Sequence, residues 1–201
     1  MHGAPQVVVC PLTGDLLQDV VRIHGQGLGY TVNSRLGAAH LAFLYQNMAR
    51  DPASFVGVAM VEKRAAGIVS GTLDEDRLKS TLLKSMSARK LAGLAAQLLI
   101  RPRLMLLWLQ SMVVALPVEC ENQEVGAVLT ALAVDPKYQG RGVGAQLVRA
   151  LEVFFGANKV PRYRLDTLAT NHRALKFYDA LGFTRVARRA GSVILVRTMG
   201  Q

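Results

Sequence analysis

The sequence predicts an α+β (mixed α/β) fold for a single domain over residues 1–201, with a helical insertion at about residues 74–119. Three observations predict this class: β-rich runs that form hairpins near both ends of the chain, a strand–loop–helix–strand unit between them, and apolar residues at helical spacing within residues 74–119. A doubly wound parallel sheet would instead alternate strands and helices along the whole chain. A length of 201 residues fits one ordinary domain that carries an insertion.

The first third of the chain is predicted to contain a strand, two helices and a β-hairpin. The helices follow from apolar residues three and four positions apart. The second helix ends at Asp51-Pro52, because proline disfavours a helical conformation in the residue before it. The expected elements are a strand at residues 7–12, helices at 16–23 and 35–50, and paired strands at 54–61 and 66–72.

The last third of the chain is predicted to hold a glycine-rich loop between a strand and a helix, and to close with a second hairpin. The helix after the loop is expected from its amphipathic pattern. The expected elements are a strand at residues 127–134, a helix at 143–155, a strand at 162–169, a helix at 171–181, and paired strands at 184–189 and 193–198.

The insertion has an unusual charge pattern. Residues 77–118 contain no Asp or Glu but seven basic residues, namely Arg77, Lys79, Lys84, Arg89, Lys90, Arg101 and Arg103. The uncharged run at residues 104–118 is 15 residues long, shorter than the roughly 20 residues that a membrane-spanning helix needs. Pro102 interrupts the helical pattern, so the segment is predicted to form two insertion helices rather than a transmembrane segment.

Composition narrows the class of protein. A hydrophobic content of 51% supports a packed core and argues against disorder. Cys10 and Cys120 lie far apart without a Cys/His cluster, so we expect no metal site, no disulfide scaffold and a reducing compartment. The first residues lack a basic segment followed by an apolar one, so we expect no signal peptide and a cytoplasmic location. A net charge of +10 suits a polyanionic ligand, whereas 6% aromatic residues and the lack of a nucleic-acid-binding motif argue against nucleic acid.

The loop at residues 135–145 is a candidate phosphate-binding loop. Its glycines let backbone N–H groups converge on an anion, and the N-terminus of the following helix adds a favourable dipole. A dinucleotide interpretation also fits Gly140-x-Gly142-x-x-Ala145, with Asp166 at a distance suited to a ribose. Five residues separate the strand from the first glycine and only about 55 residues follow the loop, so this interpretation ranks lower. A glycine-rich turn without a ligand is the third interpretation.

Two motifs together resemble the GNAT (Gcn5-related N-acetyltransferase) superfamily. Gln139-x-x-Gly142-x-Gly144 follows Leu-Ala-Val-Asp-Pro at residues 132–136 and resembles the central motif of that superfamily. Asn-His-Arg-Ala-Leu-Lys-Phe-Tyr-Asp-Ala-Leu-Gly-Phe at residues 171–183 resembles its next helix and the exit into the following strand. The resemblance covers roughly residues 6–73 and 124–200. It implies a central twisted, mostly antiparallel sheet flanked by helices, and transfer of an acetyl group from acetyl-CoA to a primary amine by direct attack in a ternary complex.

The resemblance implies which residues bind the co-substrate acetyl-CoA. The backbone of residues 132–134 would pair with the pantetheine arm, the N–H groups of residues 140–145 would hold the pyrophosphate, and Asn171 would contact the coenzyme. The implied cofactor-binding residues are Leu132, Ala133, Val134, Gln139, Gly140, Arg141, Gly142, Val143, Gly144, Ala145 and Asn171.

The resemblance also implies catalytic roles for two side chains. Tyr178 matches the tyrosine that protonates the departing thiolate, a task suited to its ordinary pKa near 10; its other interpretation is a core aromatic beside Phe177 and Phe183. Asp166 occupies the position of a glutamate base and is one methylene shorter, so it would act directly or through water. Its other interpretation is a strand-end aspartate paired with Arg162 or Arg164. Glu124 is the alternative base.

The sequence leaves the acceptor and the role of the insertion open. The acceptor is expected to be an amine on a small molecule or a peptide. The insertion is interpreted first as a pocket wall or homodimer interface, and third as a contact with a membrane surface. A transferase that uses a longer acyl-CoA and a non-catalytic acyl-CoA-binding module are the alternative functions.

Overall fold

The computed structural model describes residues 6–114, 116, 119–120 and 123–200. It divides the chain into two compact units. Unit 1 combines Met1–Thr72 with Leu129–Ala157, and unit 2 combines Leu73–Val128 with Asn158–Gln201. Each unit therefore joins segments that are far apart in the sequence.

Unit 1 contains a four-stranded part of the sheet, in the order β1-β2-β3-β6. Its strands are β1 (Val7–Pro11), β2 (Ser54–Val61), β3 (Arg64–Thr72) and β6 (Val128–Val134), the last beginning one residue before the unit boundary. β1 and β3 both run antiparallel to β2, with Val7 opposite Val61 and Ser54 opposite Thr72. The hairpin turns at Glu62 and Lys63, which both have positive φ, as the tight two-residue turns of hairpins require. The predicted hairpin at residues 54–72 is confirmed.

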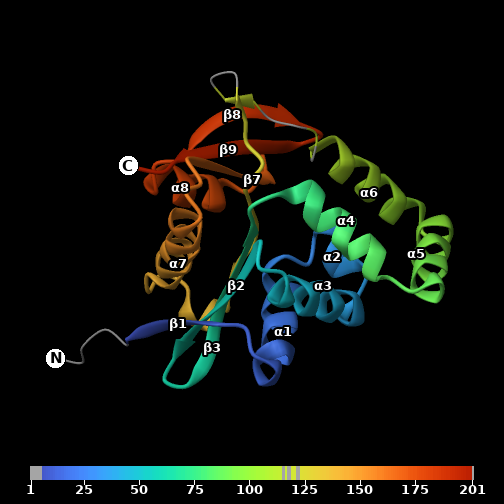
Figure 1. The fold of residues 1–201 in the computed structure, drawn as a ribbon, viewed down its shortest axis with the longest axis horizontal. Coiled ribbons are helices and arrows are strands. Elements are labelled where there is room, and N and C mark those ends of the chain that lie inside the picture. The colour runs from blue at the N-terminus through green and yellow to red at the C-terminus, as the bar shows by residue number, and fades with distance from the viewer. Residues whose placement is uncertain (1–5, 115, 117–118, 121–122, 201) are drawn as a thin grey trace. The chain divides into compact units, whose positions relative to one another are not determined.

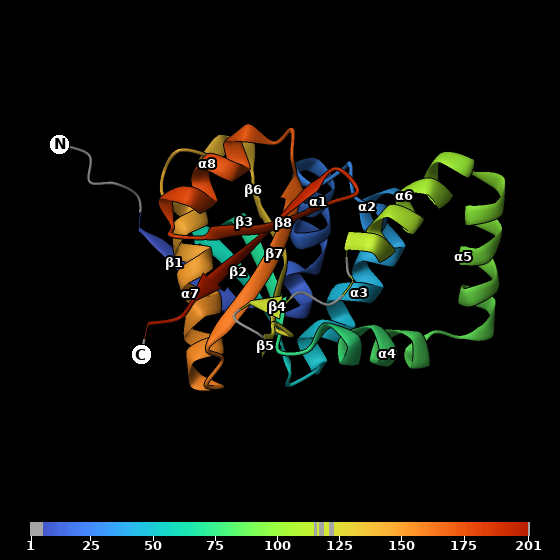
Figure 2. The ribbon, with the colours of Figure 1, turned by 90° about the horizontal axis from the view of Figure 1, so that it is seen from above.

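Helices cover both faces of the unit 1 strands. α1 (Leu17–Gly27) and α3 (Ala38–Arg50) lie on one face, and α7 (Val143–Ala157) lies on the other (Figures 1 and 2). The shorter pieces are η1 (Gly14–Leu16), α2 (Val32–Arg35) and η2 (Pro136–Tyr138). Val20, Tyr45, Val58, Ile68 and Leu151 are fully buried between these layers. Burial of such apolar side chains is the main stabilising contribution to this unit.

Unit 2 contains the closing strands, in the order β7-β9-β8. They are β7 (Arg162–Leu168), β8 (Thr184–Arg189) and β9 (Ser192–Thr198), and both pairings are antiparallel. α8 (His172–Ala180) connects β7 to β8, and β4 (Glu119–Cys120) with β5 (Gln123–Glu124) makes a separate two-stranded ladder. Val128, at the start of β6, pairs in parallel with Arg164. The seven strands belong to a mostly antiparallel sheet flanked by helices, which confirms the predicted α+β class.

The insertion contains three helices rather than the two predicted from the sequence. They are α4 (Glu75–Ser85), α5 (Ala88–Ile100) and α6 (Pro102–Val114). The additional boundary falls at Ser87, whose hydroxyl accepts a hydrogen bond from the Lys90 amide and so caps a new helix. Within the described ranges, no single helix has the length and hydropathy to span a membrane. α5 and α6 meet these criteria only as a pair that bends by 110°.

Candidate active site

The predicted phosphate loop lies in unit 1, and Asp135 anchors its start. The Asp135 carboxylate accepts hydrogen bonds from the Lys137 amide at 3.1 Å and from Arg22 at 2.9 Å, and its own amide donates to the Ala66 carbonyl at 2.9 Å. Partial burial opposes ionisation of this carboxyl, but the Arg22 and Lys137 hydrogen bonds outweigh it and lower the pKa of Asp135. An ionised Asp135 thus joins the end of β6 to α1 and β3.

Two glycines of the loop have backbone conformations that favour glycine. Gly140 and Gly142 have φ angles of +76° and +77°, in the left-handed region where a Cβ atom causes strain. The side-chain amide of Gln139 donates to the Val134 carbonyl at 3.0 Å and folds the loop back onto the end of β6. Gly144 already lies in the first turn of α7 and has no positive φ. The motif therefore places two turning glycines directly before a helix N-terminus.

The end of α7 offers an anion-binding arrangement. Val143, Gly144 and Ala145 form its first turn, where amide N–H groups have no acceptor within the helix. A helix N-terminus of this kind carries a partial positive charge and suits a phosphate. Arg141 is exposed beside it, with its guanidinium carbon 5.9 Å from the centre of the Tyr138 ring. These groups can hold a pyrophosphate through backbone donors and positive charge.

The strand before the loop packs closely through Ala133. A Cβ atom added at Gly27 would lie 2.9 Å from the Ala133 Cβ, and one added at Gly67 would lie 3.0 Å from the Ala133 carbonyl oxygen. Only small residues therefore fit between α1, β3 and this part of β6. Leu132 and Val134 point to the other face of the strand and are partly exposed. The strand is fixed in place directly before the loop.

Unit 2 holds Asp166 on the same strand face as a buried arginine. In β7, Leu165 and Thr167 are buried on one face, and Arg164 and Asp166 share the other. The Arg164 guanidinium forms a short ion pair with the Glu75 carboxylate, and its Nε donates to the Val125 carbonyl at 3.2 Å. Arg164, which the sequence suggested as a partner of Asp166, thus pairs with Glu75 instead. No local sequence pattern indicates a role for Glu75, which lies in the first turn of α4.

The pKa of Asp166 is raised above the ordinary value of 3.8. Surrounding protein atoms reduce the hydration of the carboxylate, although solvent reaches the residue, and the Glu75 charge adds repulsion. The Arg164 charge opposes both effects. A raised pKa makes Asp166 a stronger proton acceptor than an ordinary aspartate. The side chain of Glu124, the alternative base, lies outside the described part of the chain.

α8 carries the other two predicted residues. Asn171 caps this helix, because its side-chain oxygen accepts a hydrogen bond from the Ala174 amide at 3.1 Å. Tyr178 is buried, with its ring centre 5.2 Å from those of Phe177 and Phe183. This aromatic packing fixes the ring of Tyr178 and therefore also the direction of its hydroxyl group.

Comparison with known proteins finds a family match over part of the chain. Residues 107–183 match the model of the acetyltransferase (GNAT) family. N-alpha-acetyltransferase RimI of Mycobacterium tuberculosis is 41% identical over 58 residues, which are 29% of this chain and 35% of that relative. Over residues 107–183 the chain is therefore similar to the GNAT family, and it spans about a third of the length of this curated relative.

Solved structures share the GNAT fold over nearly the whole chain. SsHAT is 23% identical with a TM-score of 0.66, covering 98% of this chain and 100% of that one. PaiA N-acetyltransferase from Thermoplasma acidophilum, in complex with coenzyme A, is 12% identical with a TM-score of 0.63 and coverage of 96% and 99%. The ribosomal-protein-S18-alanine N-acetyltransferase from Escherichia coli is 14% identical with a TM-score of 0.60 and coverage of 98% and 96%. At these identities the likeness is one of fold.

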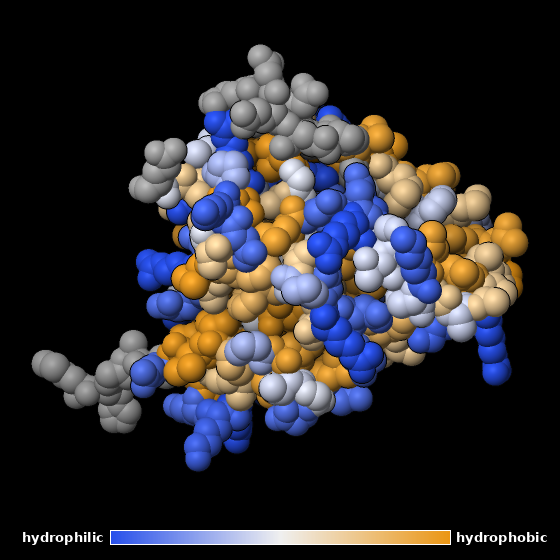
Figure 3. Space-filling model, viewed as in Figure 1, coloured by the Kyte–Doolittle hydropathy of each residue, from blue (hydrophilic) through white to orange (hydrophobic). Residues whose placement is uncertain are grey.

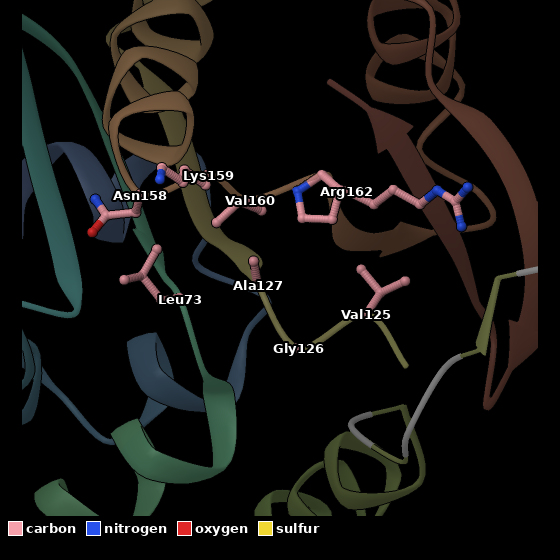
Figure 4. A pocket seen from close by; sticks show the side chains of 9 residues that line it. Leu73, Val125, Gly126, Ala127, Asn158, Lys159, Val160 and Arg162 are labelled. Carbon is pink, nitrogen blue, oxygen red and sulfur yellow. The ribbon is translucent and has the colours of Figure 1, made fainter. Parts of the chain in front are cut away.

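The GNAT match contains every predicted site residue, from Leu132 to Tyr178. A separate pocket of about 340 Å³ in unit 2 contains none of them (Figure 4). Its lining consists of Leu73 and the segments that lead into β6 and β7, namely residues 125–127 and 158–162. The described residues contain no group of three or more His, Cys, Asp or Glu side chains arranged to hold a metal ion.

The Arg164–Glu75 pair is expected to stabilise unit 2. Arg164→Met should lower the free energy of unfolding by about 2–3 kcal/mol, because it leaves Glu75 and the Val125 carbonyl without their donor. The loss is smaller than for a fully buried pair, since 20% of the Glu75 side chain is exposed and Lys79 lies 3.2 Å from it. Urea denaturation measures the change. Arg185→Met, which breaks an exposed ion pair with Asp179, should cost less than about 1 kcal/mol, and equal losses would contradict the prediction.

Proposed function

We propose that this protein is an N-acetyltransferase that moves the acetyl group of acetyl-CoA to a primary amine by direct attack in a ternary complex. The observation that carries the proposal is the loop at residues 139–145, with two left-handed glycines directly before the first turn of α7. Its neighbour in fold, PaiA N-acetyltransferase, was solved with coenzyme A. In the proposed complex the backbone of residues 132–134 pairs with the pantetheine arm, the loop holds the pyrophosphate, and Asn171 contacts the coenzyme.

In the proposed mechanism the amine nitrogen attacks the thioester carbonyl. Asp166 accepts the proton that the nitrogen loses, directly or through a water molecule, and its raised pKa supports this role. A backbone amide of residues 132–134 stabilises the negative charge that develops on the carbonyl oxygen. The C–N bond is then complete, the C–S bond breaks, and the Tyr178 hydroxyl protonates the departing thiolate. Acetyl-CoA and the amine yield coenzyme A and an amide.

The acceptor is a primary amine, and a peptide α-amine is the class that the relatives favour. RimI is named as an N-alpha-acetyltransferase, and the Escherichia coli protein as an N-acetyltransferase of an alanine of ribosomal protein S18. An acceptor panel should therefore contain short peptides with free and blocked N-termini, together with small-molecule amines. Acetylation restricted to free N-termini would support the peptide class, and acetylation of small amines alone would contradict it.

Release of free thiol from acetyl-CoA tests the proposal, with mass spectrometry of the acceptor as a second readout. Gly142→Ala should weaken coenzyme binding, because alanine at φ +77° strains the loop although its Cβ has room. Gly156→Ala is the matched control, since Gly156 lies in α7, the helix that follows the loop, is exposed and has no positive φ. Thiol release with an acetylated acceptor supports the transferase. Coenzyme binding without turnover on any acceptor would instead indicate a non-catalytic acyl-CoA-binding module.

A further inference from the structure

The helices α5 and α6 of unit 2 expose a large apolar surface. Leu99, Ile100 and Leu106 have exposed fractions of 78%, 77% and 57%. We call this surface the insertion face; its large apolar residues are Leu91, Leu99, Ile100, Met105, Leu106, Trp108, Leu109, Met112, Val113 and Leu116. Figure 3 shows hydrophobic residues gathered over α5 and α6, at the right of the view. Proteins rarely leave contiguous apolar surface of this kind in water without a binding role.

The exposed residues follow one side of α6. Met105, Leu109 and Met112 are spaced by four and three residues, which places them one above the other on the helix. Leu104 and Val114, the buried residues of α6, lie on the opposite side. The structure therefore gives α6 an inner side that packs and an outer side that is apolar and exposed. α5 has no buried residue and continues this surface through Leu91 and Leu99.

The charged residues of the segment that contains the insertion face, residues 77–118, are all positive. Lys84, Arg89, Lys90, Arg101 and Arg103 are exposed at the ends of the three insertion helices. No Asp or Glu occurs between Arg77 and Val118. An apolar helix face bordered only by basic side chains is typical of helices that lie in the interface of an anionic bilayer.

The positive charge near the insertion face favours a membrane over a second copy of this chain as its binding partner. A two-fold dimer through the insertion face would bring the basic residues of both copies together without an acidic partner on that face. An anionic lipid surface supplies the opposite charge and also accepts the apolar side chains. α5 and α6 each have 13 residues, about 20 Å in length, which suits helices lying in the interface rather than crossing a core of about 30 Å.

We propose that the insertion face attaches this protein to the surface of a membrane rich in anionic phospholipid. The preference differs from the order expected from the sequence, where a pocket wall or dimer interface ranked first. The structure changes the order because the outer side of α6 is exposed, while residues 77–118 contain basic but no acidic residues. Attachment is independent of acetyl transfer, so it can be measured without acetyl-CoA or an acceptor.

Vesicle binding of the full chain tests the proposal. Trp108 is the only tryptophan of the chain and belongs to the insertion face, so its fluorescence reports directly on this surface. Vesicles of phosphatidylglycerol and phosphatidylcholine should bind the protein and shift the Trp108 emission to the blue, and brominated acyl chains should quench it. Pure phosphatidylcholine vesicles should bind about tenfold or more weakly, and added salt should reduce the difference.

Two variants test the contributions of positive charge and of apolar surface to vesicle binding separately. Arg101→Glu with Arg103→Glu should weaken binding to anionic vesicles by about thirtyfold or more. Leu109→Glu should abolish the blue shift, because it places a charge in the centre of the outer side of α6. Lys63→Glu with Arg64→Glu is the matched control: it makes the same charge change at exposed residues of the β2–β3 hairpin and should leave more of the binding intact.

Three results would overturn the proposal. Equal binding to neutral and anionic vesicles would remove the role of charge. Vesicle binding without a change in Trp108 fluorescence would place the contact on another surface. A wild-type dimer that fails to bind vesicles, and that Leu109→Glu converts to a monomer in sedimentation experiments, would identify the insertion face as an interface between two copies. Circular dichroism confirms that each variant is folded.

Discussion

Tyr178→Phe is expected to lower the turnover number of acetyl transfer by about 10²- to 10⁴-fold, the usual contribution of a general acid. The change removes only the hydroxyl group, so the departing thiolate loses its proton donor. The ring contacts with Phe177 and Phe183, at 5.2 Å each, are available to phenylalanine as well. The variant should therefore fold normally and bind acetyl-CoA with unchanged affinity. Steady-state thiol release and calorimetric titration with acetyl-CoA measure the two effects separately.

Tyr163→Phe is the matched control for this prediction. Tyr163 is another buried tyrosine of unit 2, and its ring packs edge-to-face on the same Phe183 at 5.4 Å. No catalytic role is proposed for Tyr163, so its variant should retain turnover within a few-fold. A similar small loss in both variants would mean that Tyr178 is a core aromatic, as its other interpretation holds. Any general-acid role would then belong to another group or to water.

Local sequence patterns predicted the elements that local interactions determine. The hairpins at residues 54–72 and 184–198, the helix after the glycine loop and the strand that carries Asp166 all formed at the expected places within a few residues. The glycines of the loop were informative because Gly140 and Gly142 need a backbone conformation that other residues rarely adopt. The break between α4 and α5 was missed, because Ser87 becomes a helix cap only where the preceding chain is already extended.

Long-range pairings could not be predicted from the same patterns. Arg164 and Glu75 are 89 residues apart in the sequence, and Arg22 and Asp135 are 113 apart. Nothing in the local sequence of β7 indicates that Arg164 pairs with Glu75 rather than Asp166. That choice leaves Asp166 repelled by Glu75 and thereby contributes to its raised pKa. The identity of the candidate base was thus accessible from a motif, whereas its protonation behaviour depends on the tertiary structure.

The exposure of the insertion face is a further property that the sequence alone does not determine. Apolar residues at helical spacing predicted helices, and such helices normally bury that face against their own domain. In α6 only Leu104 and Val114 are buried, while the residues on the outer side remain exposed. The sequence already shows that residues 77–118 contain basic but no acidic residues. This pattern favours a membrane surface over a pocket wall or dimer interface only when the neighbouring apolar residues are exposed, as the structure shows them to be.

The second large effect is expected at low pH and depends on His24 in unit 1. His24 is 3% exposed, and its Nδ1 shares a hydrogen bond of 2.5 Å with the Tyr45 hydroxyl. Its Nε2 has no hydrogen-bond partner among the described residues. Burial disfavours the charged imidazolium and lowers the pKa of His24 to about 4, from an ordinary value of 6.5. His24 is therefore neutral in the folded protein at pH 7.

The direction of the pH effect follows from this pKa. Between about pH 6.5 and pH 4 the unfolded chain binds a proton at His24 and the folded chain does not, so acidification favours unfolding. The contribution is absent above the unfolded pKa and complete below the folded one. Over this window His24 should lower the free energy of unfolding by about 1.4 kcal/mol per pH unit, or roughly 3 kcal/mol in all.

Urea denaturation at pH 7.0, 5.5 and 4.5 measures the slope for the wild type and for His24→Asn. The variant cannot take up this proton, so its free energy of unfolding should fall less steeply below pH 6.5, although it starts from a lower value at pH 7. Acidic groups also titrate in this range, and the difference between the two slopes isolates the histidine. His172→Asn, a change at an exposed histidine, should keep the wild-type slope. Parallel slopes for the wild type and His24→Asn would show that His24 takes up its proton in the folded state as readily as in the unfolded chain.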